Sequence, residues 1–152
     1  MSFLVNVLAS VAGAVIFWVV TRYLQPALHQ LLWNGTQVAG RWDFWDADPS
    51  LGGKPVGSVV LQQRARVITG VATRHTNRTG TPTSREYRYA GQLSARELIM
   101  TFHASDRPDY IRGALVLHLD NSGRVLSGKT VYYDEEAATV TPHPIWYTRE
   151  SA

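Results

Sequence analysis

The eight-residue stretch SREYRYAG, at positions 84–91, is crowded with arginine and tyrosine. Side chains alternate between the two faces of a β-strand, so Arg85, Tyr87 and Tyr89 would share one face. Arg88 would then lie on the opposite face. Guanidinium groups bind phosphate through paired hydrogen bonds, and tyrosine rings stack on the flat bases of nucleotides. This pattern is therefore typical of a site for a phosphate-bearing, aromatic ligand.

The charge of the surrounding segment also favours an anionic partner. Residues 64–96 contain seven arginines and one acidic residue, Glu86, whereas residues 97–152 carry five basic and eight acidic side chains. The positive segment contains no lysine, and the planar guanidinium suits bidentate phosphate binding better than an ammonium group does. Anionic lipid head groups would attract the same charge. Charge alone therefore leaves a phosphate ligand and a lipid surface open.

Further aromatic residues lie in segments that resemble strands. Tyr132 and Trp146 each stand next to another aromatic residue in the sequence. An aromatic ring near a guanidinium holds a base by stacking, but aromatic residues on strands are also ordinary core filler. We include Tyr132 and Trp146 in the candidate ligand site, with core packing as the alternative for each.

Patterns for catalysis or metal binding are scarce. The chain has no cysteine, which excludes disulfides, thiolate metal sites and cysteine nucleophiles. The histidines have no partner at metal-ligand spacing; they are His29, His75, His103, His118 and His143. The sequence contains neither a serine nucleophile elbow nor a glycine-rich phosphate loop. We therefore expect no enzyme activity, no metal and no cofactor.

The N-terminal segment determines where these side chains would act. Residues 3–20 form an uncharged, mostly apolar run, close to the roughly 20 residues that span a bilayer. Trp18, Arg22 and Tyr23 lie near its end, as is typical of a membrane interface. We interpret residues 1–23 as a single-pass transmembrane anchor, with a signal peptide and a buried core helix as the alternatives. The positive-inside rule then places the rest of the chain in the cytosol.

A short connecting segment follows the anchor. Within residues 24–36, leucines recur at helical spacing, and Pro26 allows a bend. This pattern predicts an amphipathic helix along the membrane interface, which ends in a linker at the NGT turn. The chain up to this turn is too short for a second membrane crossing.

The rest of the chain, 37–152, predicts a mainly β domain. Short β-rich runs alternate with turn residues throughout. We predict eight strands, at 40–47, 57–65, 66–75, 84–93, 97–104, 110–120, 124–134 and 139–149. Eight strands in a meander with short connections favour a compact up-and-down barrel like that of the lipocalins, because closure removes exposed sheet edges.

Alternation along the strands predicts which residues line the barrel. One inner row is expected on each of two neighbouring strands: Leu98, Met100, Phe102 and Ala104 on one, and Ile111, Gly113, Leu115, Leu117 and Leu119 on the other. Glycines inside strands, such as Gly91 and Gly113, are expected where the barrel bends. The GRW sequence that opens the first strand is similar to the opening of lipocalin-like and avidin-like barrels. Closure would bring Trp42 next to Arg149 as a cation over an indole ring.

The whole arrangement resembles one known family. A hydrophobic N-terminus, a linker and a barrel that opens on GRWDFW, with strand glycines in RVITG, YAG, IRG and RVLSG, are similar to the membrane-anchored β-barrel effectors of bacterial CBASS antiphage signalling. In that family, two transmembrane helices precede a SMODS-associated barrel, whereas this chain has one clear apolar run. The resemblance implies a protein of the bacterial inner membrane that binds a cyclic oligonucleotide, forms homo-oligomers and disrupts the membrane.

The resemblance also implies roles for individual residues. Arg85 or Arg88 would pair with a phosphate, and Tyr87 or Tyr89 would stack on a base. A ligand with two phosphates needs a second cation, which Arg74 on the neighbouring strand would supply. The expected partners are a cyclic oligonucleotide, membrane lipid and further copies of the chain, but not DNA or RNA.

Two other functions remain open at the level of sequence. A lipocalin-like carrier would hold an apolar ligand in a dry cavity and would be exported. A non-enzymatic inner-membrane adaptor would use the barrel to bind another protein.

Overall fold

The chain divides into two compact units, Met1–Gly35 and Thr36–Ala152. A computed structural model describes residues 2–25, 35–106, 112–134 and 138–150, with the side chains of residues 2–9 and 134 excepted. The second unit begins one residue before the expected start of the barrel.

In its described residues, the first unit contains the helix α1 (Ser2–Val19), which continues into a π-helical turn, η1 (Val20–Leu24). The helix forms over the apolar run, and its described large apolar side chains are exposed, including Phe17 at 69%. Nevertheless, no helix in the described part of the chain is long and apolar enough to cross a membrane. The structure thus gives no support to the transmembrane span predicted over residues 3–20. The interfacial helix predicted within 24–36 lies almost wholly outside the described residues.

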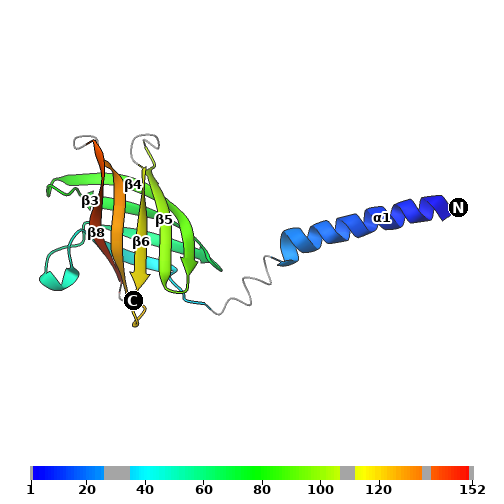
Figure 1. Ribbon diagram of the computed structural model, residues 1–152, viewed down its shortest axis with the longest axis horizontal. Coiled ribbons are helices and arrows are strands. Elements are labelled where there is room, and N and C mark those ends of the chain that lie inside the picture. Colours follow the sequence, from blue (N-terminus) through cyan, green and yellow to red (C-terminus); the bar gives the residue numbers. More distant parts are fainter. Residues whose placement is uncertain (1, 26–34, 107–111, 135–137, 151–152) are drawn as a thin grey trace. The chain divides into compact units, whose positions relative to one another are not determined.

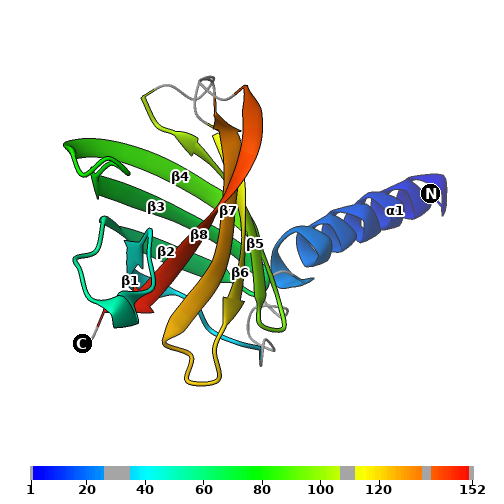
Figure 2. The ribbon, with the colours of Figure 1, turned by 60° about the vertical axis from the view of Figure 1, so that its left-hand side comes forward.

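The second unit is a closed barrel of eight antiparallel strands, as predicted. The strands are β1 (Gly40–Trp45), β2 (Gly57–Arg64), β3 (Val67–Thr76), β4 (Pro82–Ser94), β5 (Glu97–Ala104), β6 (Arg112–Leu119), β7 (Val125–Asp134) and β8 (Thr139–Arg149). A short 3₁₀ turn, η2 (Pro49–Leu51), lies between β1 and β2. Each strand pairs with its neighbour in sequence, and β1 pairs with β8 to close the ring (Figures 1 and 2).

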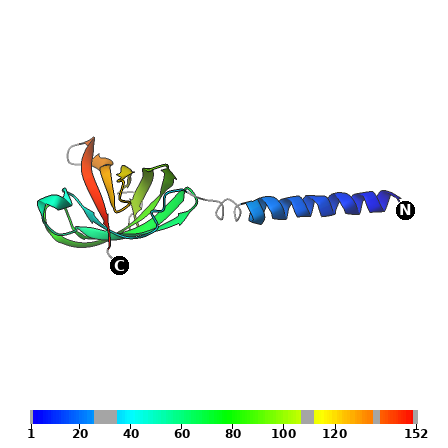
Figure 3. The ribbon, with the colours of Figure 1, turned by 90° about the horizontal axis from the view of Figure 1, so that it is seen from below.

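The buried core residues lie inside the ring of strands, whose backbone Figure 3 shows from below. The expected inner rows are buried on β5 and β6, where Leu98 and Leu117 are register partners and both are 0% exposed. Phe102 and Gly113 share this face but are only partly buried, and Ile111 lies outside the described residues. The outer wall carries the alternate side chains, so the two-residue period predicted the face of each described position.

Two glycines allow neighbouring strands of the barrel wall to approach one another closely. A Cβ atom added at Gly91 would lie 2.0 Å from the carbonyl oxygen of Ile99, and one added at Gly128 would lie 2.0 Å from that of Val116. Any other residue would force the paired strands apart. The sequence predicted glycine inside strands for this reason, and the geometry at both positions agrees.

One end of the barrel is closed by the segment that leads into β1. Val38 is fully buried there, and its backbone N–H donates to Oε1 of Gln63 at 2.8 Å. The indole Nε1 of Trp42 donates to the carbonyl of Val38 at 2.9 Å. The guanidinium of Arg149 lies 5.1 Å from the centre of the Trp42 ring, which confirms the predicted contact between these two residues. We name this end the closed end and the opposite end the mouth.

Candidate functional site

Strand β4 carries the SREYRYAG stretch from the mouth into the barrel. Its inner-face residues become more exposed towards the mouth: Tyr89 is 7% exposed, Tyr87 is half-buried and Arg85 is exposed. Tyr87 and Tyr89 both pack edge-on against Phe102, with ring centres 5.8 and 5.7 Å apart. The predicted alternation therefore presents an arginine and a tyrosine at the rim of the mouth, above a buried tyrosine.

Arg74 and Arg85 are register partners on β3 and β4. Cross-strand partners lie on the same face of a sheet, so both side chains belong to the inner face at the mouth. Two like charges in this position repel one another, and a counter-charge is required to stabilise them. In the described part of the chain, Arg85 forms no ion pair, whereas Arg74 does.

The partner of Arg74 is Asp46, in the turn after β1. The Nη2 group of Arg74 pairs with Oδ2 of Asp46, and both side chains are largely buried, at 14% and 22% exposed. Arg74 also donates from Nε to the carbonyl of Thr76 at 2.7 Å. Its guanidinium lies 5.9 Å from the centre of the Phe44 ring. These contacts hold the guanidinium in one orientation.

One buried polar atom of this ion pair, Oδ1 of Asp46, accepts no hydrogen bond from any described residue. The buried hydroxyl of Tyr147 interacts with that of Tyr89. A buried polar group without a partner costs about 1 to 3 kcal/mol, so such atoms are natural contacts for a water molecule or a polar ligand group. The mouth therefore contains unused hydrogen-bonding capacity next to a fixed cation.

The buried tyrosines next to the ion pair stay neutral at ordinary pH. Burial raises the pKa of Tyr89 to about 12 and raises the pKa of Tyr147 well above its usual value. Both hydroxyls can therefore donate as well as accept a hydrogen bond at pH 7.

A second aromatic group lies on β7 and β8. The rings of Tyr132 and His143 stack with their centres 5.1 Å apart and their planes 19° apart. The guanidinium of Arg78, in the turn between β3 and β4, lies 5.1 Å from the centre of the Tyr132 ring. The predicted Tyr132 is thus in contact with a cation, although with a different arginine from those expected.

A cleft of about 730 Å³ includes Tyr132. It is lined by parts of β5, β6, β7 and β8: Thr101, Phe102, His103, Arg112, Gly113, Ala114, Val131, Tyr132, Tyr133 and Val140. Phe102 and Tyr132 belong to the inner face, and Phe102 contacts both Tyr87 and Tyr89. Most of the other lining side chains face outwards, so the cleft lies on the outer wall, with Phe102, Gly113 and Tyr132 as its inner-face members.

Arg88 and Trp146 do not join this group. Arg88 lies on the outer wall, opposite Val71 and His103 in register. Trp146 also faces outwards, where it is the register partner of Trp45. The structure therefore brings together Arg74, Arg85, Tyr87, Tyr89 and Tyr132 of the predicted site, and separates Arg88 and Trp146 from them.

Sequence reasoning missed Asp46, Arg78, His143 and Tyr147 as members of the mouth. Alternation along β1 from the buried Trp42 and Phe44 would have placed Asp46 on the inner face. The same argument along β8 applies to His143 and Tyr147. Arg78 lies in a turn, so no periodicity could have indicated its contact with Tyr132.

The described residues contain no group of three or more His, Asp or Glu side chains that could hold a metal ion. What the mouth offers is binding chemistry: guanidinium groups for anions, aromatic rings for stacking and an unpaired buried oxygen of Asp46 for a hydrogen bond.

Fold and site together define a closed, eight-stranded antiparallel barrel with a cationic, aromatic mouth. No protein-family model matches the sequence. A comparison with curated protein sequences likewise finds no match.

Proposed function

We propose that this protein is a non-enzymatic binding protein whose barrel mouth holds a small, phosphate-bearing aromatic ligand. The observation that carries the proposal is the register pairing of Arg74 with Arg85 on the inner face, beside the half-buried Tyr87. A phosphate between the two guanidinium groups would supply the counter-charge that Arg85 lacks in the described structure.

Arg74 and Arg85 would have different roles in binding. Arg74 is fixed by Asp46 and Thr76, so it needs little reorganisation to meet an anion. Arg85 is exposed at the edge of the mouth and would close on the ligand from there. Tyr87, held edge-on by Phe102, offers a ring face on which a base would stack.

The ligand class that we propose is a cyclic oligonucleotide, on the basis of the sequence resemblance to CBASS effectors. Such a ligand carries at least two phosphates and two bases, which agrees in kind with two arginines and several tyrosines around one opening. In this proposal, binding orders the mouth and favours assembly of several copies, which would then disrupt the bacterial inner membrane.

Attachment to the membrane is part of the same proposal. The uncharged α1 exposes large apolar side chains, including Ile16 at 63% and Phe17 at 69%. We assign this helix to membrane attachment on the inner membrane, with the barrel in the cytosol.

The two rival functions have less support. A carrier of an apolar ligand would line its site with apolar side chains, whereas the mouth contains an ion pair and an unpaired buried oxygen of Asp46. An adaptor would use the outer wall, where Ile99 and Val116 are register partners and about half exposed. Isolated exposed apolar residues are ordinary on protein surfaces, so we rank this function below ligand binding.

Calorimetric titration of the full chain with a panel of cyclic di- and trinucleotides tests the proposal. We expect saturable binding of one of them, and a loss of affinity of about tenfold or more for Arg85→Gln, because one charge-assisted phosphate contact is removed. Arg88→Gln makes the same charge change on the outer wall and serves as the control. Equal effects of the two variants, or no binding by the folded protein, would reject the proposal.

A further inference from the structure

The turns at the closed end follow one repeated pattern. Arginine comes directly after a residue with positive φ in each of three hairpins, which are β2–β3, β4–β5 and β6–β7. The three positive-φ residues and their φ values are Ala65 at 51°, Ala95 at 53° and Gly123 at 71°. The arginines that follow are Arg66, Arg96 and Arg124, all of them exposed.

The backbone of each of these arginines is fixed in the same way. Its carbonyl accepts a hydrogen bond from the strand next along the barrel: Arg66 from Leu93 at 2.8 Å, Arg96 from Leu119 at 2.9 Å and Arg124 from Arg149 at 2.9 Å. The three hairpins alternate around the closed barrel, so these arginines are spread around its rim. We name Arg66, Arg96 and Arg124, together with the neighbouring exposed Arg64, the arginine rim.

The charge of the closed end stays positive after its acidic residues are included. Glu97 is 2.6 Å from His118, and Glu150 is 3.1 Å from Arg41, so both carboxylates already have partners. Asp120 caps its own turn by accepting from the backbone N–H groups of Arg124 and Val125, both at 3.0 Å. In the described part of the chain, Arg64, Arg96 and Arg124 form no ion pair.

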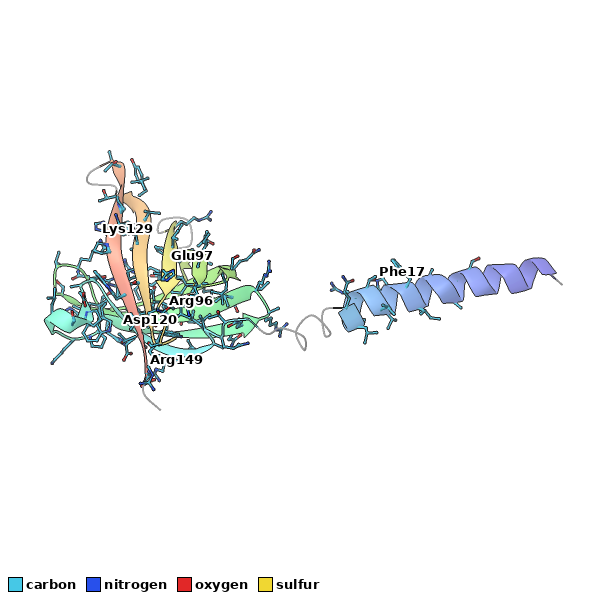
Figure 4. The ribbon with its side chains drawn as sticks, turned by 60° about the horizontal axis from the view of Figure 1, so that its bottom comes forward. Phe17, Arg96, Glu97, Asp120, Lys129 and Arg149 are labelled. Carbon is cyan, nitrogen blue, oxygen red and sulfur yellow. The ribbon has the colours of Figure 1, made fainter. Side chains whose placement is uncertain are left out.

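Part of the arginine rim borders a surface cleft of about 690 Å³. Its lining includes Arg96, Arg124 and Arg149 together with the carboxylates of Asp120 and Glu150. Arg96 donates to Oδ1 of Asn121, which lines the same cleft. Figure 4 shows Arg96, Asp120 and Arg149 towards one end of the barrel and Lys129 well away from them. The polypeptide also reaches the barrel here, because Thr36 lines the same cleft and Val38 closes the barrel.

We propose that the closed end is a docking surface for anionic phospholipid head groups. A ring of cations around a barrel end meets a flat anionic surface at several points at once, whereas a nucleic acid strand would need the charges along one groove. Only ten residues, 26–35, separate Gln25 from Thr36, which lines the cleft. The proposal concerns a different surface from the mouth and does not depend on what the mouth binds.

Binding of the full chain to lipid vesicles tests the arginine rim. The vesicles are phosphatidylcholine alone or phosphatidylcholine mixed with phosphatidylglycerol. We expect the triple variant R64Q/R96Q/R124Q to lose at least about tenfold in affinity for the anionic vesicles and nothing measurable for the neutral ones. The affinity of the unchanged chain for anionic vesicles should also fall with added salt.

A matched variant separates this proposal from a simple effect of net charge. R78Q/R85Q/R88Q removes three exposed arginines near the mouth and on the outer wall, so its loss of charge is identical. We expect it to weaken nucleotide binding and to leave vesicle binding within about twofold, and the rim variant to do the reverse. Equal loss of vesicle binding in both triple variants would overturn the lipid proposal, as would no loss in the rim variant when the unchanged chain binds anionic vesicles more tightly than neutral ones. A rim variant that instead lost only nucleotide affinity would assign the closed end to the nucleotide.

A second measurement covers the case in which α1 alone holds the chain on every vesicle. Hydrogen exchange of the full chain is compared on anionic and on neutral vesicles. The account predicts slower exchange in the turns at 94–97 and 120–124 on anionic vesicles only, because the rim is then covered. Unchanged exchange in both turns would contradict it.

Discussion

At the scale of single residues, the mouth is defined by two neighbouring arginines, of which Arg74 has a carboxylate partner and Arg85 forms no ion pair in the described part of the chain. Arg74 is neutralised by Asp46 inside the barrel, whereas the neighbouring Arg85 is an exposed cation at the edge of the mouth. Natural proteins rarely keep like charges directly opposite one another on a sheet without a compensating contact. This pair is therefore the part of the molecule in which stability and ligand binding are most closely linked.

A double-mutant cycle measures how much the ion pair between Arg74 and Asp46 contributes to the free energy of unfolding. Because Arg74→Met leaves the carboxylate of Asp46 buried and unpaired, we expect it to lower the free energy of unfolding by about 2 to 4 kcal/mol. Asp46→Asn in addition should restore part of this loss, with a coupling energy of about 1 to 3 kcal/mol in denaturant titrations. Arg88→Met, on the exposed outer wall, should change stability by less than about 0.5 kcal/mol. A coupling energy near zero would show that the pair does not stabilise the fold.

The buried tyrosines give stability a dependence on alkaline pH. Burial raises the pKa of Tyr89 to about 12 in the folded state, above the usual value of 10.0, so the folded protein holds this proton more tightly than the unfolded chain does. The stabilisation is complete below pH 10 and is lost as the pH rises from about 10 to 12. We expect this loss to reach about 2 to 3 kcal/mol for Tyr89.

Unfolding curves of the unchanged chain and of Tyr89→Phe across this pH range test the assignment. The variant should lose less stability than the unchanged chain between pH 10 and 12, with the remaining dependence due to groups such as Tyr147. Parallel pH profiles for the two proteins would rule out Tyr89 as the titrating group.

At the scale of the elements, the strands and the N-terminal helix could be predicted well, whereas the membrane span could not. Period-two alternation and turn residues gave eight strands close to their observed bounds, because each strand buries one face. The inner-face position of Arg85, Tyr87 and Tyr89 follows from the same rule. The pairing of Arg74 with Asp46 could not be predicted, because it depends on the register of three strands and on a turn. The apolar composition of residues 3–20 suggested a membrane span, which the structure does not support.

The close strand contact at Gly91 leads to a prediction about packing. Gly91→Ala would put a methyl group against the backbone of Ile99 and Met100, which cannot move without breaking the β4–β5 ladder. We expect a loss of about 1 to 3 kcal/mol in the free energy of unfolding. Ser94→Ala, at an exposed position of the same strand, should have little effect. Equal stability of the two variants in urea titrations would contradict the packing argument.

At the scale of the whole molecule, the barrel has two ends with different chemistry. The closed end combines a buried plug at Val38 with the arginine rim, and the mouth combines fixed and exposed arginines with tyrosine rings. We infer a division of work in which one end faces a lipid surface and the other faces the solution that contains the ligand. In a chain this short, such a division would let a dissolved ligand control a protein that is held on a membrane.

Amide NMR of the isotope-labelled full chain during titration with a cyclic dinucleotide tests the binding site most directly. The account predicts saturable shifts confined to the mouth, in segments 44–46, 72–76, 85–89 and 130–133, and none in the turn at 120–124. Saturable shifts confined to the closed end or the outer wall, or no shifts with any member of the nucleotide panel, would contradict it.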